Sequence, residues 1–349
     1  MNLQNNKDRD RSGPGFGKPE NNLAKDSSET TREAFNSSFT EYKKHKLHRQ
    51  QLSGANLVGG LGVNRGGVLS KEEHNFLEWF IGFSEGDGSF VIANAEPAKP
   101  RLFFSINQIE RKVLNKVAKG LGFGNVISYT QTIKQGKKEI KKQYSRYSAT
   151  SFDDLTSLIH IFNGNILTGK VQTRFKRWLD AYNLLARVTS GTSSSILFRQ
   201  SSPTFTLQSA WFAGFVDAEG GFYAKLSVPT PKTPERLRLK FYITQQDDRL
   251  ILENIRDSLQ LSITKARPRG HAKAIITRGD TSILEMATPA IFLELFKYFA
   301  NYPLRGSKRL VFFRWKFVFE NRDLRKNVAD PDKLRRFKRV IKNIQITND

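Results

Sequence analysis

The chain has 349 residues, enough for about two domains, and its 38% hydrophobic residues include 27 Phe, which can supply a substantial core. Its 57 Lys and Arg against 33 Asp and Glu leave a net charge of +24, an excess that attracts polyanions and above all nucleic acid. Cysteine is absent, which excludes disulfides, cysteine-based zinc sites and thiol nucleophiles. No apolar run approaches the roughly 18 residues that a membrane span needs.

Residues 1–70 are rich in Asn, Ser, Gly and charged residues and show no sustained apolar period, which predicts a disordered polar extension. They lack the apolar core of a signal peptide and carry seven acids, so they do not resemble a cleavable targeting signal. Their charge is only +4, which leaves +20 on residues 71–349. The basic character therefore belongs to the part that should fold.

Three blocks of sequence occur twice, in the same order. They are WFIGFSEGDGSF and WFAGFVDAEGGF (79–90 and 211–222), FSINQ and FYITQ (104–108 and 241–245), and FNGNILTGKVQTRFKRW and FANYPLRGSKRLVFFRW (162–178 and 299–315). The first pair is offset by 132 residues and the other two by 137, as a five-residue insertion in one loop would produce. The chain is therefore predicted to be a tandem duplication.

The repeat divides the chain into five predicted parts. They are a polar extension (1–70), a first unit (71–187), a Ser-rich linker (188–206), a second unit (207–325) and a basic C-terminal helix or tail (326–349).

Both units share one predicted order of elements, αββαββα, in an α+β fold with antiparallel sheets. The first helix starts at a capping box formed by Ser70 and Glu73 and runs into an acidic, glycine-rich turn. Two strands, a helix with apolar period (113–121 or 251–259), two more strands and a basic final helix follow.

The segment RLRLKFYIT (236–244) alternates polar and apolar residues, as a half-buried strand does. The polar face would carry Arg236, Arg238, Lys240, Tyr242 and Thr244. The first copy repeats this face with Arg101, Phe103, Ser105 and Asn107. A strand ribbon with such a face can lie in a DNA major groove and read base edges, whereas a merely solvated face is the alternative. Recurrence in both copies favours the DNA-binding interpretation.

Small residues recur four positions apart just before the acids, as Gly82 and Gly86 in the first copy and Gly214 and Ala218 in the second. They leave one face of each helix without bulk, so we expect these two faces to pack against each other. The aromatic residues around them, including Trp79 and Trp211, should then enter two separate cores.

A close helix pair would bring Asp87 and Glu219 together at its end. Two neighbouring carboxylates repel each other unless a divalent cation lies between them. Mg²⁺ commonly takes one or two protein carboxylates and leaves its other positions to water and phosphate oxygens, an arrangement suited to phosphodiester hydrolysis. A helix-ending glycine would explain one such turn but not both copies, and the turn lacks the closing Glu of a calcium loop, since Asn94 stands there.

The two motif copies, with their repeated FSINQ and FYITQ blocks, resemble the LAGLIDADG homing endonucleases in their single-chain, two-motif form. The resemblance covers about residues 71–320. It implies a pseudo-twofold saddle whose sheets line a DNA groove, with the motif helices at the interface. It also implies Mg²⁺-dependent cleavage of both strands of a long, asymmetric target by a monomer, leaving short 3′ overhangs.

The family resemblance assigns roles to individual residues. It implies that the second acids, Asp87 and Glu219, bind metal together with the preceding Gly86 and Ala218. The first acids, Glu85 and Asp217, would make structural hydrogen bonds.

A strand-end Gln and a basic residue before each final helix would act on water and phosphate. The residues that match are Gln108, Gln245, Lys170 and Lys308. By strict alternation the Gln side chains fall on the apolar face, so their role requires the strand ends to turn toward the centre.

Two other functions are compatible with the same fold. An RNA maturase would assist splicing of its host intron RNA, and a non-catalytic regulator would bind DNA without cutting it; retention of both acids favours cleavage. Residues 331–345 could form a basic helix that contacts phosphates or RNA, or an amphipathic helix packed on the second unit. An organelle, mitochondrion or chloroplast, is implied only through the family.

Overall fold

A computed structural model describes residues 39–48, 69–93, 101–135, 138–190, 195–201, 205–232, 235–264, 275–326 and 330–348. The first unit contains α2 (Lys71–Asp87), β1 (Gly88–Ala93), β2 (Arg101–Gln108), α3 (Arg111–Leu121), β3 (Asn125–Gln135), β4 (Lys138–Ala149), α4 (Phe152–Phe162) and α5 (Gly169–Ser190). The second contains α6 (Trp211–Glu219), β5 (Gly220–Leu226), β6 (Leu237–Gln246), α7 (Arg249–Thr264), β7 (Ile276–Arg278), β8 (Thr281–Met286), α8 (Pro289–Asn301) and α9 (Lys308–Glu320). A 3₁₀ turn, η1 (Arg322–Lys326), and α10 (Pro331–Asn348) follow.

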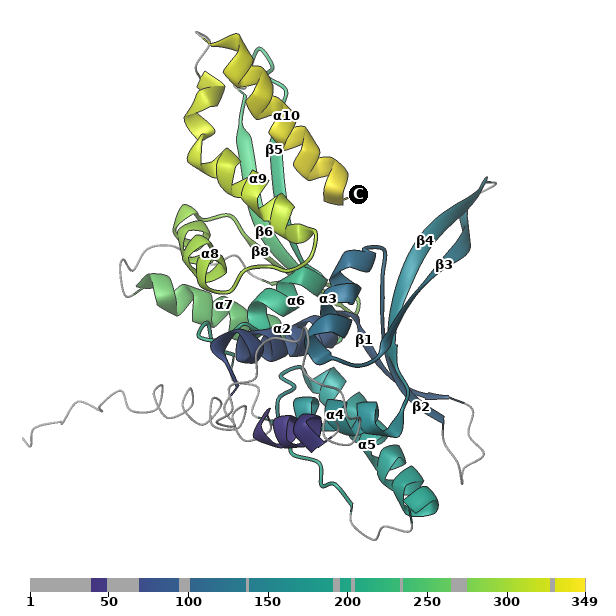
Figure 1. Ribbon diagram of the computed structural model, residues 1–349. Coiled ribbons are helices and arrows are strands. Elements are labelled where there is room, and N and C mark those ends of the chain that lie inside the picture. The colour runs from purple at the N-terminus through teal and green to yellow at the C-terminus, as the bar shows by residue number, and fades with distance from the viewer. Residues whose placement is uncertain are drawn as a thin grey trace, which may run out of the picture.

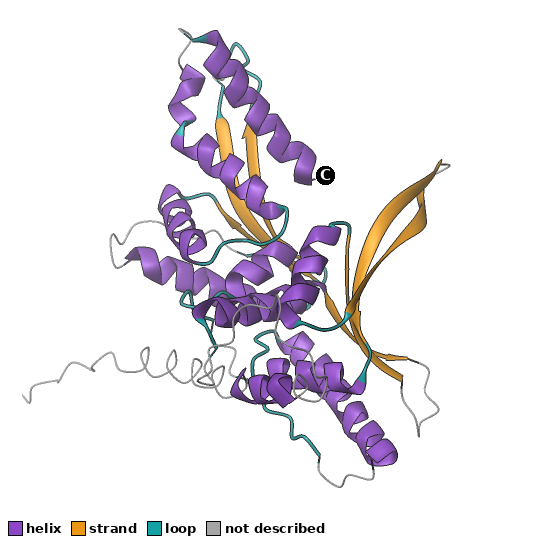
Figure 2. Ribbon diagram, viewed as in Figure 1, coloured by secondary structure: helices purple, strands orange, loops and turns teal. Residues whose placement is uncertain are grey.

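The α+β fold and the tandem repeat are confirmed. The strands form two antiparallel sheets with the orders β1-β2-β4-β3 and β5-β6-β8-β7, so the same topology occurs twice. Figure 2 shows the strands running outward in two directions from a central group of helices. Each unit also has a helix beyond the predicted order, α4 or α8, between its last strand and its final helix.

The two cores are built alike from aromatic residues on matching strands. Phe90 of β1 lies opposite Phe104 of β2, and Phe222 of β5 lies opposite Phe241 of β6. The fully buried Trp178 and Trp315, from the two final helices, pack on Phe90 and Phe222 with ring centroids 5.4 and 5.3 Å apart. The repeat therefore extends from sequence to side-chain packing.

Helix α2 begins at the predicted capping box. The Ser70 hydroxyl accepts a hydrogen bond from the Glu73 amide at 3.2 Å, and the Ser70 amide donates to the Glu73 carboxylate at 3.0 Å. The helix ends by passing directly into β1, because Gly88 has extended backbone angles rather than the left-handed ones of a glycine stop. Asp87 is thus fixed between a helix and a strand.

The centre of the molecule is the contact between α2 and α6, which lie side by side (Figure 1). A methyl group added to Gly82 would collide with the main-chain carbonyl of Trp211, and one added to Gly214 would collide with that of Trp79. A methyl on Gly86 would likewise overlap Ala218. The helix backbones touch, so the predicted small-residue faces do form the interface.

The placement of Trp79 and Trp211 in separate cores was only half correct. Both are fully buried, but each indole N–H donates across the interface, from Trp79 to Asp217 at 2.9 Å and from Trp211 to Glu85 at 2.6 Å. The physical reason is that a buried indole N–H needs an acceptor, and the carboxylate at the end of the facing helix is within reach.

Residues 39–48 form a helix, which departs from the predicted disorder of 1–70. Phe39 and Tyr42 are buried against the first unit, and the Tyr42 hydroxyl donates to the Leu121 carbonyl at 3.2 Å. Two aromatic residues three positions apart on one helix face provide the apolar contact that this prediction overlooked. The remainder of the extension up to residue 68 lies outside the described residues.

The C-terminal basic helix is present as α10, and it packs on β5 and α9 (Figure 1). Its apolar residues Phe337, Ile341 and Ile344 are buried, and the Gln345 side chain donates to the Ala224 carbonyl at 3.2 Å. Since β5 is an edge strand, α10 covers an edge that another chain could otherwise pair with. No helix in the described part of the chain is long and apolar enough to cross a membrane.

Replacing Gly82 or Gly214 by Ala should destabilise the protein by about 3 kcal/mol or more, because the added methyl meets rigid main chain rather than a flexible side chain. Gly169→Ala is the matched control, since its added methyl would lie 3.8 Å from the nearest atom, and its effect should stay within about 1 kcal/mol. Thermal unfolding measures both. Equal melting temperatures for Gly82→Ala and Gly169→Ala would contradict the backbone contact.

Candidate active site

The helices α2 and α6 end at Asp87 and Glu219, on either side of the pseudo-twofold axis. A Cβ added to Gly86 would lie 2.9 Å from Glu219 Cγ and 3.4 Å from Glu219 Oε1, so the two helix ends touch. Burial is the main cause of the raised pKa of Asp87, and the charge on the neighbouring Glu219 adds to it. The structure therefore brings the two predicted acids together.

Lys308, the first residue of α9, reaches into this acidic centre. Its Nζ donates to the main-chain carbonyls of Ala218 at 2.7 Å and Val216 at 3.3 Å. Burial lowers the pKa of Lys308, and Asp87, Asp217 and Glu219 counteract that effect. An ammonium group thus lies where a cation is electrostatically favoured.

Burial is also the largest influence on the two central acids. It raises the pKa of Asp87 to about 7, while the nearby Lys308 acts in the opposite direction. It raises the pKa of Glu219 as well, against the effects of Lys308 and Lys170. Both carboxylates are held in a setting that disfavours their charge unless a cation accompanies them.

The donor atoms at this centre fit a hard divalent cation. Asp87 and Glu219 offer carboxylate oxygens, and Gly86 and Ala218 have main-chain carbonyls in the last turns of their helices, where such carbonyls lack helical partners. Within the described ranges no group of three or more His, Asp or Glu side chains could hold a metal. Two carboxylates agree with the preference of Mg²⁺ for few protein ligands, with the other positions left to water and phosphate.

The two predicted strand-end glutamines differ in their surroundings. Gln108 Nε2 donates to Asp87 Oδ2 at 2.6 Å, so the end of β2 does turn toward the centre in spite of the alternation. Gln245 is 5% exposed and lies opposite Ser282 of β8, and its Oε1 has no hydrogen-bond partner among the described residues. Among the described residues, Gln108 but not Gln245 forms a hydrogen bond to an acid.

The first acid of each motif has the structural role that was predicted. Glu85 accepts hydrogen bonds from the Leu167 and Thr168 amides at 3.0 and 2.7 Å as well as from Trp211. Asp217 makes the equivalent contacts on the other side. Its donors are Trp79 and the amides of Arg305 and Gly306 at 2.9, 2.7 and 3.3 Å. Each acid therefore joins its own motif helix to the loop before its final helix and to the facing motif helix.

The second predicted lysine, Lys170, occupies a different position from Lys308. Its Nζ forms an ion pair with Asp247 at 2.9 Å and donates to the Gln246 carbonyl at 3.4 Å. It is nonetheless close enough to Glu219 to lower the pKa of that acid. The structure therefore places one of the two lysines inside the acidic centre and the other at its margin.

A model of the LAGLIDADG endonuclease family matches residues 80–182 and again residues 212–319, which together make up more than half of the chain. The chain belongs to the LAGLIDADG endonuclease family. The two matches fall within the two structural units, so the resemblance seen in the motif pair is confirmed.

Curated relatives of this LAGLIDADG chain come from fungi. It is 28% identical over 272 residues to the probable intron-encoded endonuclease 4 of Neurospora crassa and 27% identical over 278 residues to the probable intron-encoded endonuclease Cox1-I1b of Schizosaccharomyces pombe. The alignments cover 77% and 74% of this chain but only 44% and 66% of those relatives. The chain thus spans about half to two thirds of their length.

Solved structures show the same fold at low sequence identity. The I-SmaMI LAGLIDADG homing endonuclease bound to cleaved DNA matches with a TM-score of 0.51 at 18% identity, over 81% of this chain and 97% of that one. The LAGLIDADG meganuclease I-AabMI bound to uncleaved DNA matches with a TM-score of 0.50 at 17% identity, over 76% and 98%.

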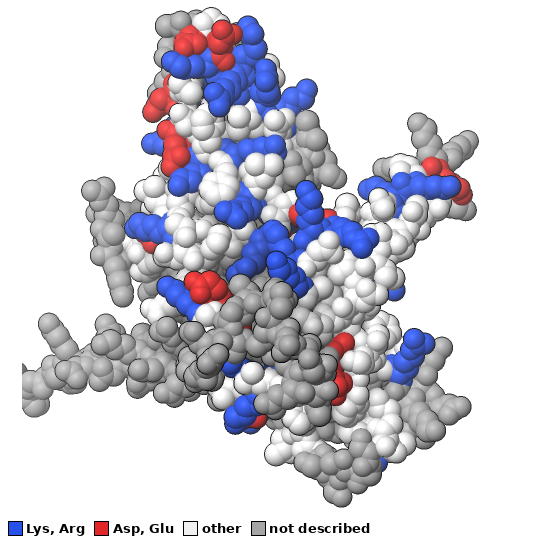
Figure 3. Space-filling view, viewed as in Figure 1, with Lys and Arg blue, Asp and Glu red and all other residues white. Residues whose placement is uncertain are grey.

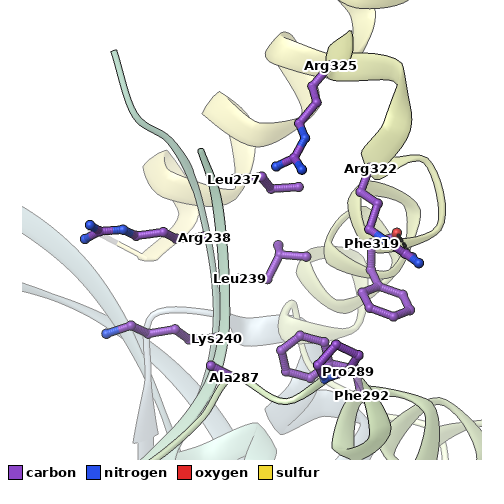
Figure 4. A pocket seen from close by; sticks show the side chains of 10 residues that line it. All are labelled: Leu237, Arg238, Leu239, Lys240, Ala287, Pro289, Phe292, Phe319, Arg322 and Arg325. Carbon is purple, nitrogen blue, oxygen red and sulfur yellow. Dashed lines mark hydrogen bonds between the residues drawn. The ribbon is translucent and has the colours of Figure 1, made fainter. Parts of the chain in front are cut away.

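In this LAGLIDADG fold the side chains of β6 that were predicted to face DNA point in the opposite direction from its apolar side chains. Leu237 and Leu239 point into a cavity of about 540 Å³ lined by Phe292 and Phe319, whereas Arg238 and Lys240 point away from it (Figure 4). Arg236 is exposed just before the strand, and Tyr242 and Thr244 are half-buried. The alternation therefore holds, and Lys240 is further paired with Glu285 of β8 at 2.8 Å.

The corresponding face of β2 departs from the prediction at one position. Arg101 and Asn107 are exposed and Phe103 is half-buried, but Ser105 is 4% exposed, because the neighbouring strands β1 and β4 pair with β2 on both sides of it. Asn107 Oδ1 accepts hydrogen bonds from Arg146 at 2.8 Å and Tyr129 at 3.2 Å. These two partners on β4 and β3 went unpredicted, although both belong to strands with alternating polar residues.

Positive charge is spread over both units of the LAGLIDADG fold. Figure 3 shows Lys and Arg over α10 and around the middle of the visible face, where the helices of the two units meet, with fewer acids among them. This distribution agrees with the sequence, in which +20 of the +24 charge falls on residues 71–349.

Asp87→Asn should stabilise the metal-free protein more at pH 8 than at pH 5. The fold raises the pKa of Asp87 from 3.8 to about 7, so the folded protein binds more protons than the unfolded chain between these values and loses stability as pH rises through them. Asn cannot ionise and avoids this loss. Melting temperatures of both proteins in a chelator at the two pH values test it, and a difference that is equal at both would contradict it.

Proposed function

We propose that this protein is a site-specific DNA endonuclease that hydrolyses one phosphodiester bond in each strand of a long, asymmetric target with the help of Mg²⁺. One observation carries the proposal. Two carboxylates, Asp87 and Glu219, are held together by helices whose backbones touch, and the cation Lys308 lies beside them. Keeping two carboxylates close together and largely buried lowers the stability of the metal-free protein. Such a cost is expected of a centre that binds a divalent cation, whose charge is higher than that of Lys308.

The residues of this chain have distinct tasks in the proposed reaction. Asp87 and Glu219, with the carbonyls of Gly86 and Ala218, would hold Mg²⁺. When bound, the metal supplies activation of water and stabilisation of the leaving oxygen. Gln108, hydrogen-bonded to Asp87, is placed to orient a water molecule beside that acid. Lys308 would exchange its carbonyl contacts for an oxygen of the scissile phosphate and balance the charge that develops there.

Double-stranded DNA is the partner that the two sheets fit. The exposed Arg236, Arg238, Arg101 and Asn107 supply donors suited to base edges and phosphates. Since both catalytic halves occur in one chain, a monomer suffices to cut both strands. Short 3′ overhangs are expected from the chain's membership of the LAGLIDADG family. The names of the fungal relatives support an origin in an intron, and an organelle is implied through the family.

The test is cleavage of a duplex that spans the insertion site of the host intron in its intronless allele. Wild-type protein with Mg²⁺ should cut both strands, and Asp87→Asn should reduce cleavage by more than about 100-fold, the scale on which one electrostatic group at a reacting centre acts. Binding of the duplex should persist. Glu253→Gln, which removes an acid that pairs with Arg249 on α7 instead of binding Lys170 or Lys308, is the matched control and should cut normally.

Intact DNA after binding by the wild-type protein would refute the nuclease. If the same protein restored splicing of the intron RNA, the maturase function would replace it. If neither reaction occurred and binding remained specific, the protein would be a DNA-binding regulator.

A further inference from the structure

The two halves of the centre differ by one residue in the turn that follows the matched glutamines. Two residues separate Gln108 from the start of α3 at Arg111, whereas three separate Gln245 from the start of α7 at Arg249. The additional residue is Asp247, which adopts a left-handed backbone conformation with φ 59°. Asp is one of the few residue types that tolerate this conformation.

The residues on either side of this insertion correspond well. Glu110 precedes α3 and accepts a hydrogen bond from the Ser307 amide at the start of α9, at 2.7 Å. Asp248 precedes α7 and accepts one from the Lys170 amide at the start of α5, at 3.4 Å. Each unit thus caps the final helix of the other with one acid. Asp247 has no equivalent in the first unit, and its carboxylate forms an ion pair with Lys170.

We propose that Asp247 makes the two cleavage centres unequal by holding Lys170 away from the scissile phosphate of one strand, while Lys308 remains available to the other. The inference rests on the proposed nuclease function. Lys170 is 23% exposed and bound to a carboxylate, so it must break an ion pair before it can contact DNA. Lys308 donates to main-chain carbonyls and lies beside Asp87 and Glu219, so it reaches a phosphate at the centre without leaving its acidic neighbours. Asp247 is therefore a positioning residue for the slower of the two strands.

The first test uses a duplex labelled differently on its two strands, cut by the full-length protein with Mg²⁺. Wild-type protein should cut one strand faster than the other. Asp247→Asn keeps a residue that tolerates the backbone conformation and removes the charge, so it should speed the slower strand by about two- to five-fold, the scale of one partly exposed ion pair. The faster strand should keep its rate. Glu253→Gln removes an acid of the same unit and should leave the ratio unchanged.

A second test measures binding alone, in Ca²⁺, with duplexes in which a neutral methylphosphonate replaces one scissile phosphate. Wild-type binding should weaken when the phosphate opposite Lys308 is neutralised and change little for the other strand. Binding by the Asp247→Asn variant should weaken when either scissile phosphate is neutralised. Equal sensitivity of the wild type to both substitutions, or a strand ratio that Asp247→Asn does not change, would overturn the inference. Absence of any cleavage would refute the nuclease function instead, and the binding pattern would still decide the role of Asp247.

Discussion

The contact between the backbones of α2 and α6 is the constraint on which the rest of the structure depends. Gly82 and Gly214 leave no room for a side chain between the helices, so the spacing and angle of the pair are fixed by main-chain atoms. Because each helix passes directly into the first strand of its sheet, this contact also fixes the orientation of both sheets. The same two helix ends carry Asp87 and Glu219, so one contact sets the geometry of the surface and of the chemistry.

The first and second acids of the two motifs differ in how the protein surrounds them. Burial raises the pKa of Glu85 and Asp217 as well, but several hydrogen bonds to each carboxylate offset part of that effect. Asp87 and Glu219 receive little such compensation from the protein, and burial raises the pKa of both. The first pair joins the two motif helices through hydrogen bonds across the interface, whereas the second pair lies at the helix ends beside Lys308, where a cation is favoured. Perturbed carboxylates of this kind are typical of functional sites.

Much of this arrangement was predictable because it depends on short sequence patterns or on the internal repeat. The capping box at Ser70, the small residues at Gly82 and Gly214, and the alternation along β6 each depend on a few neighbouring residues. The partners of buried polar groups were not predictable in the same way. The acceptor of a buried indole N–H depends on the distance between the two helices. Residue spacing in the sequence does not determine that distance. For that reason the prediction placed Trp79 and Trp211 in their own cores but did not include the hydrogen bonds that they make across the interface.

The positions of Gln108 and Lys170 illustrate a second limit. The repeat predicted that the two halves would match, and the residues do recur, but a strand end that turns and a turn with one residue more decide where their side chains lie. A single inserted residue changes nothing in composition or periodicity. It alters the local backbone path and adds the acid that binds Lys170, which lies one position before the repeat equivalent of Lys308.

The two bonds that cross the helix interface are similar but not interchangeable. Trp79 meets Asp217, whereas Trp211 meets Glu85, a side chain longer by one methylene group. Two copies of the first unit would place Trp79 against Glu85, and two copies of the second would place Trp211 against Asp217, so the two observed pairs occur only when the two different units meet. The two different halves therefore complement each other at this interface.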